Sequence, residues 1–141
     1  MHQRRSPDDD RGSAPLEFLL AGLLLLVPLA YLVVAVTTVQ NAALAADATA
    51  RFVARSLTTG IDPDTTLRVV ADSYGIDLAA LDMTMACAPV SAPCPQAGST
   101  VVVHVTVVVA LPLVPDFLAG ATSIPVEAHA TQKISRYWEA P

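Results

Sequence analysis

Residues 15–58, PLEFLLAGLLLLVPLAYLVVAVTTVQNAALAADATARFVARSLT, decide the fold of this 141-residue chain. From Phe18 to Val36 the stretch has 19 consecutive residues without a charge. At about 1.5 Å per residue in a helix, such a run nearly covers the roughly 30 Å hydrocarbon core of a bilayer. A helix buried in a small soluble protein is rarely apolar on every side. The run therefore predicts a transmembrane helix, and an extension to Val39 would allow it to tilt.

The helical pattern continues past the predicted span. Apolar residues recur alternately four and three positions apart, while polar residues such as Gln40, Asp47 and Arg51 occupy the other faces. The stripe ends before Gly60, which can adopt the left-handed cap conformation. One helix is thus predicted from about residue 15 to about residue 58, and its apolar stripe can pack within this chain or against a partner helix. The stripe comprises Leu32, Val36, Val39, Ala43, Ala46, Ala50, Val53 and Leu57.

Beyond residue 58 the periodicity changes. Asp62 followed by Pro63 is typical of a helix start, and the short helix that it begins is predicted to end at Gly75. Three later segments alternate with the period of two that a half-buried strand requires. They cover residues 81–87, 100–110 and 124–134. The stretch LPLVPDFLAGATS between the second and the third segment is predicted to be a loop. The fold class is therefore α+β, with a small antiparallel sheet packed on the outer half of the long helix.

The charges near the span predict its orientation. Arg4, Arg5 and Arg11 precede the apolar run, whereas Arg51 and Arg55 are the first basic residues after it. An excess of basic residues close to the span favours a cytoplasmic N-terminus. The predicted organisation is then a polar leader over residues 1–12, a transmembrane and extended helix over residues 13–58, and an extracytoplasmic α+β domain over residues 59–141.

Cys87 and Cys94 are the two cysteines of the chain. A spaced pair in a small exported domain usually forms a disulfide, and this pair would close a loop between the first two strands. A single C-x₆-C pair without nearby histidines is poor support for a zinc site. We therefore predict a Cys87–Cys94 disulfide and no bound metal.

The motifs of the sequence favour a protein that is not an enzyme. The sequence contains no nucleophile elbow and no phosphate-binding glycine loop, and its net charge of −5 without a basic stripe argues against nucleic-acid binding. His104 and His129 could share a sheet face near Glu127 or Asp116, which is the minimum for a metal or acid–base site. Both histidines also occupy alternating positions where solvent-facing polar residues are expected, and we favour that interpretation. No cofactor is predicted.

Two export signals compete with a permanent anchor. Arg4-Arg5 resembles the start of a twin-arginine signal, but SPDDD separates the pair from the apolar run. A conventional signal peptide could be cleaved near Ala43-Leu44-Ala45, although its apolar region would be much longer than usual. Under this alternative, residues 1–45 act as a signal or anchor for a secreted or membrane-tethered binding domain.

The segment GSAPLEF, residues 12–18, followed by a long apolar helix, resembles the processing site of type IV-like prepilins. In that family a cytoplasmic prepilin peptidase cuts after a glycine, and the fifth residue of the mature chain is a glutamate. Here Gly12 would precede the cut, Ser13 would become the N-terminus, and Glu17 stands at the fifth position. Phe18 matches an aromatic residue frequent in the Tad-pilus branch. The chain thus resembles the TadE-like minor pilins and pseudopilins.

The resemblance implies a single-pass membrane component of a Tad-type pilus or a related secretion system. Its implied partners are the membrane, other pilin or pseudopilin subunits, pilus assembly proteins and the prepilin peptidase, for which Gly12, Ser13 and Glu17 are substrate positions. After cleavage, the Glu17 carboxylate could pair with the Ser13 ammonium of a neighbouring subunit and fix the stagger of packed helices. Alternatively, the carboxylate reaches the headgroups or favours the positive helix N-terminus.

Overall fold

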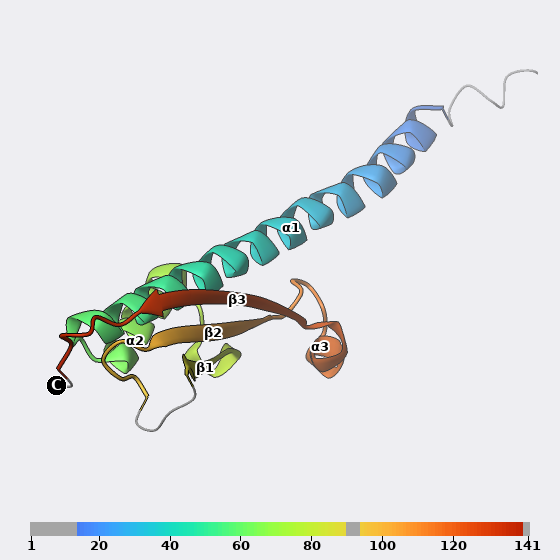
Figure 1. Ribbon diagram of the computed structural model, residues 1–141. Helices are drawn as coiled ribbons and strands as arrows, with labels where there is room; N and C mark the ends of the chain where they lie inside the picture. The colour runs from blue at the N-terminus through green and yellow to red at the C-terminus, as the bar shows by residue number, and fades with distance from the viewer. Residues whose placement is uncertain (1–13, 90–93, 140–141) are drawn as a thin grey trace, which may run out of the picture. The chain divides into compact units, whose positions relative to one another are not determined.

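The computed structural model describes residues 14–89 and 94–139 of the chain. The elements follow in the order α1 (Ala14–Thr59), α2 (Pro63–Tyr74), a 3₁₀ turn η1 (Leu78–Ala80), β1 (Leu81–Ala88), β2 (Thr100–Val109), α3 (Asp116–Thr122) and β3 (Ile124–Lys133) (Figure 1). The chain divides into two compact units between Val36 and Thr37, within α1. We call them unit 1 and unit 2 and describe each by itself.

Unit 1 consists, in its described part, of the first half of α1. Every leucine and valine in this half is exposed, from 45% at Val36 to 70% at Leu19 and Leu25. The segment is long and apolar enough to cross a membrane, and its most apolar window has no buried residue. Such exposure is costly in water and favourable in hydrocarbon, because each buried leucine gains about 1.5–3 kcal/mol on leaving water. These properties fit single-pass anchoring in a membrane.

Unit 2 is built around the second half of α1, which packs on one face of the sheet (Figure 1). The packed side chains on the helix recur three or four positions apart, as one face of an α-helix requires. Most are alanines, whose small side chains let the helix backbone approach the sheet closely. The buried residues of α1 are Ala42, Ala45, Ala46, Thr49, Ala50, Val53, Ala54, Ser56 and Leu57.

The apolar stripe expected from the sequence is partly corrected by this packing. Its last four members, from Ala46 to Leu57, are buried, and Val39 is half-buried. Ala43, however, is exposed, and Ala42 occupies the core in its place. The helical period does not explain the exposure of Ala43, because Ala43 and the buried Ala50 are seven residues apart and only about 20° apart around the helix. Leu32 and Val36 belong to unit 1 and are exposed.

The three strands form an antiparallel sheet, as predicted, and their order in it is β1-β2-β3. On β2, the odd-numbered valines from Val101 to Val109 are buried, with exposures of 7% or less, whereas His104 and Val108 point to the other face. Register pairs such as Met83↔Val105 and Val105↔Ala128 carry the buried face across all three strands. The α+β fold class is therefore confirmed.

The connection between β2 and β3 differs from the expected loop, because it contains α3. Two prolines and a glycine in this stretch oppose regular structure. Pro115, however, lies before the first helical residue, a position where its missing N–H costs no helical hydrogen bond. One short helix therefore forms in a segment whose composition predicts none.

Capping interactions fix the bounds of α2 as predicted. The Asp62 carboxylate accepts hydrogen bonds from the Thr65 backbone N–H at 2.8 Å and the Thr65 hydroxyl at 2.7 Å. Both hydrogen bonds hold the pKa of Asp62 below its usual value, and the bond from the Thr65 hydroxyl has the larger effect. At the other end Gly75 adopts a left-handed conformation with φ of 64°, and Gly60 does so after α1 with φ of 72°. Glycine reaches this region without steric cost.

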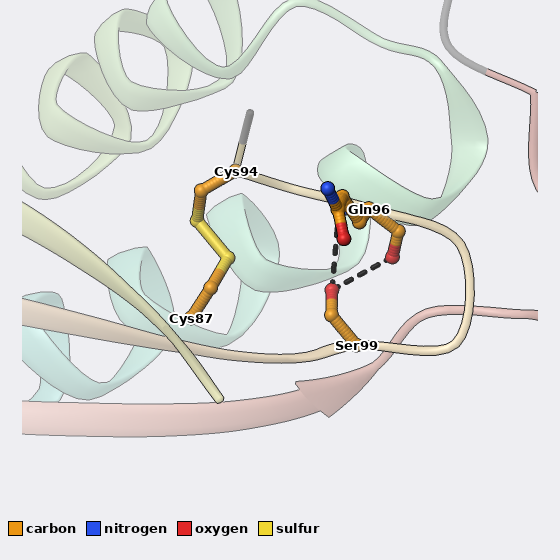
Figure 2. The surroundings of a disulfide bond; sticks show 4 residues. All are labelled: Cys87, Cys94, Gln96 and Ser99. Atoms are coloured by element: carbon orange, nitrogen blue, oxygen red, sulfur yellow. Dashed lines mark hydrogen bonds between the residues drawn. A yellow bond between two sulfur atoms is a disulfide. The ribbon is translucent and has the colours of Figure 1, made fainter. Parts of the chain in front are cut away.

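The predicted disulfide between Cys87 and Cys94 is present, with a Cα–Cα distance of 6.0 Å (Figure 2). Beside it, the buried Ser99 hydroxyl donates to the Gln96 carbonyl at 2.7 Å and accepts from the Gln96 N–H at 3.2 Å. The Ile134 N–H then donates to the Ser99 carbonyl at 2.8 Å. The disulfide thus ties the end of β1 to the chain that enters β2, and the hydrogen bond from Ile134 ties that chain to the segment that follows β3.

Candidate functional site

The residues of the expected processing site lie mostly outside the described part of the chain. Gly12 and Ser13 fall among the residues that the structure does not describe. Glu17 lies in the first turn of α1 and is exposed. It is the one charged residue between positions 14 and 36. A carboxylate in the first turn interacts favourably with the positive end of the helix dipole.

The solvent-facing side of α1 in unit 2 carries an ion pair between Arg51 and Asp47. The Arg51 Nε lies 3.0 Å from Asp47 Oδ1, and the two side chains are 72% and 45% exposed. An exposed pair of this kind contributes little to stability, because water screens the charges. The pair solubilises this face of the helix and forms no binding site by itself.

His104 and His129 are direct partners across β2 and β3, as pairing of their strands was expected to produce. Their ring centroids are 5.9 Å apart with the rings tilted by 30°, and both residues are exposed on the sheet face opposite α1. In the described residues, no group of three or more histidines, cysteines and carboxylates could hold a metal ion. The side chain of Asp116 lies outside the described residues. The two histidines thus form a cross-strand contact without a described third ligand.

A groove between α1 and α2 was not expected from the sequence. It has a volume of about 370 Å³, and its walls include Phe52 from α1 and Val69 and Tyr74 from α2, with Ile61 between the helices. Phe52, Ile61 and Val69 are 55%, 56% and 61% exposed. A groove lined by large exposed apolar side chains is typical of a binding surface. The available signal was Phe52, a large apolar residue outside the predicted stripe.

A second exposed apolar feature lies in the connection between β2 and β3. Leu113 is 89% exposed and Phe117 is 84% exposed, although both are large apolar residues. Leu113 also has a positive φ of 63°, which is rare for a leucine. The sequence marked this segment only as a loop with apolar residues.

Among the described residues, unit 2 therefore offers the groove, the exposed Leu113 and Phe117, and the histidine pair, and unit 1 offers an apolar helix with Glu17 near its start. Comparisons of the chain with protein-family models, curated proteins and solved structures find no match. Functional inference rests on the geometry and the chemistry of these surfaces.

Proposed function

We propose that the chain is a non-enzymatic minor pilin or pseudopilin of the TadE-like kind. In this role it is a single-pass membrane component of a Tad-type pilus or a related secretion system, with its N-terminus in the cytoplasm. The supporting observation is α1, one uninterrupted helix of 46 residues. Its first half is exposed and apolar with Glu17 in the first turn, and its second half forms the core of an antiparallel-sheet unit.

Glu17 is the strongest chemical support for the proposal. An unpaired carboxylate at the edge of hydrocarbon is unfavourable, so such a residue in a membrane helix usually has a partner. Cleavage after Gly12 would create an ammonium group at Ser13, because an α-amine has a pKa near 8. A neighbouring subunit could present this group to Glu17, and the pair would favour one axial stagger between helices.

The composition of unit 2 supports an extracytoplasmic position. Its two cysteines are joined in a disulfide, and such bonds persist mainly in oxidising compartments. The excess of arginines before the apolar segment favours the same orientation, with residues 1–12 in the cytoplasm, where a prepilin peptidase acts on its substrates.

The alternative is a secreted or membrane-tethered binding domain whose first 45 residues act as a signal or anchor. The apolar groove between α1 and α2 favours this alternative, since it could hold a ligand. Cleavage near Ala45 would, however, remove Ala42 and Ala45 from the core of unit 2, where they are 2% and 1% exposed. Loss of these contacts makes a cut at this position unfavourable for the fold.

Processing by a prepilin peptidase is the test of the proposal. The full chain is co-expressed with the peptidase, and loss of the leader is followed by intact mass. We expect Gly12→Ala to abolish cleavage, because the enzymes of this family cut after glycine. Gly22→Ala is the matched control: an added methyl at Gly22 would meet no atom within 4 Å, so cleavage should continue. Equal cleavage of the two variants would contradict the proposal.

A further inference from the structure

Leu113 and Phe117 together form what we call the apolar tip of unit 2. The chain leaves β2 at Val109, and Leu111, Pro112 and Val114 are half-buried. Leu113, which lies between the half-buried residues, and Phe117, which follows them, project into solvent. No lysine or arginine occurs between positions 110 and 123, and Asp116 is the one charged residue there. The tip is therefore an apolar projection with little charge around it.

The backbone at the tip supports a functional role for this exposure. Leucine disfavours a φ of 63°, because its Cβ clashes with the backbone in the left-handed region. At an 89% exposed position nothing in the core of unit 2 requires a leucine. Asparagine or glycine would fit the backbone better. A strained apolar residue in solvent is an outlier of the kind that accumulates at binding sites.

The tip lies at the end of unit 2 where the chain enters from unit 1. Asn41, in the first turns of this part of α1, donates from its Nδ2 to the Tyr74 carbonyl at 3.3 Å, so the end of α2 lies beside it. A short connection then leads to Leu81, whose register partner is Val107, near the end of β2. Figure 1 shows α3 beside the start of β3, at the opposite end of the sheet from the β3 arrowhead.

We propose that the apolar tip inserts into the surface of the bilayer that anchors the chain. This inference rests on the membrane anchoring in the proposed function. The chain enters unit 2 at Thr37, directly after the apolar segment, and the tip lies at this entry end of unit 2. An aliphatic and an aromatic side chain both suit the boundary between headgroups and acyl chains.

A lipid surface fits the tip better than a protein partner does. A stable protein interface buries about 800 Å² on each side, far more than two side chains can supply. A bilayer needs no shape complementarity, and the covalent anchor keeps its surface at a high effective concentration. Because residues 110–123 contain no lysine or arginine, insertion of the tip is driven by apolar burial and requires no anionic lipid.

The experiment places a polarity-sensitive fluorophore on single introduced cysteines in the full chain. The native cysteines are joined in the disulfide and remain unlabelled. Leu113→Cys and Phe117→Cys report on the tip, and Leu24→Cys reports on the predicted span. Tyr137→Cys is the solvent control, because Tyr137 is 94% exposed and follows β3 at the other end of the sheet. Each protein is reconstituted in phosphatidylcholine vesicles with and without nitroxide-labelled acyl chains.

We expect the labels at positions 113, 117 and 24 to shift their emission to the blue and to lose most of it to the nitroxide lipids. The label at position 137 should do neither, and high salt should not change the pattern. If positions 113 and 117 behave like 137 while 24 is quenched, tip insertion is wrong and the anchor stands. If position 24 is not quenched either, the anchoring fails and the inference with it. A blue shift at 113 and 117 without lipid quenching would indicate a protein contact and overturn the inference.

Discussion

The two halves of α1 belong to one helix and differ in how their apolar side chains are exposed. In unit 1 the helix is rich in leucine and exposes it on all sides, whereas in unit 2 it is rich in alanine and buries one face. The leucines have no packing partners among the described residues of unit 1, and their favourable environment is lipid. The alanines gain little by transfer to lipid and instead allow close contact with the valines of β2. The side chains thus indicate that the first half suits lipid and that the second half suits packing on the sheet.

The largest expected effect comes from placing the same charge in each half. Leu26 and Leu44 are 64% and 62% exposed on the same helix, so a difference between them reflects the surroundings and not the packing. Leu26→Arg should reduce membrane retention, because an arginine near the centre of a span costs about 2.5–3.5 kcal/mol. Leu44→Arg should leave retention unchanged. The measurement is the fraction of each protein that resists alkaline extraction from membranes.

Equal retention of the two arginine variants would break the distinction between the halves. Loss of both would indicate that the membrane-embedded segment reaches Leu44, and retention of both would indicate that unit 1 does not depend on lipid.

A smaller effect is expected from enlarging an alanine on the packed face. Ala50 is fully buried in the core cluster that includes the sheet, whereas Ala43, seven residues earlier on nearly the same side of the helix, is exposed. Ala50→Leu should lower the free energy of unfolding of unit 2 by about 1–3 kcal/mol, because overpacking displaces neighbouring atoms. Ala43→Leu should change it by much less. Urea unfolding of the full chain in detergent, followed by the fluorescence of Trp138, reports on this unit because Trp138 packs against its core.

Similar destabilisation by the two leucine variants would contradict the packing of α1 on the sheet. Destabilisation by Ala43→Leu alone would contradict both the exposure of Ala43 and the burial of Ala50.

The smallest expected effect concerns the cap of α2. The hydrogen bonds from Thr65 lower the pKa of Asp62, so the folded state favours its ionised form. The stabilisation is present above the unfolded pKa of about 3.9 and is lost as the pH falls through the lower folded value. Asp62→Asn should remove this acid-dependent loss and keep a capping side chain. Asp72→Asn, away from the cap, should retain it in urea unfolding measured between neutral and acidic pH.

Much of the fold was predictable because its signals are local. The long helix and the three strands follow from unbroken apolar periodicity, and the caps at Asp62 and Gly75 follow from the conformations that these residues favour. The exposure of Ala43 was not predictable, because it depends on which part of the helix the other elements of unit 2 cover, and no local pattern specifies this. The short α3 was missed because prolines and a glycine dominate its surroundings.

The candidate surfaces were less predictable than the fold. The sequence could predict that His104 and His129 are neighbours only if their strands pair in the right register, which they do in the structure. The groove around Phe52 depends on how α2 lies against α1, which no local pattern specifies. The exposure of Leu113 and Phe117 likewise depends on the path of the chain after β2. Apolar composition predicts burial, and only tertiary structure reveals where burial does not occur.

The first residue of the chain recovered from membranes tests the account most directly. Wild-type protein is isolated from cells that contain a prepilin peptidase, and its N-terminus is sequenced. We predict a membrane-bound chain that begins at Ser13 and retains all of α1, which starts at Ala14. A soluble chain that begins near Ala46 would contradict it and would establish residues 1–45 as a cleaved signal.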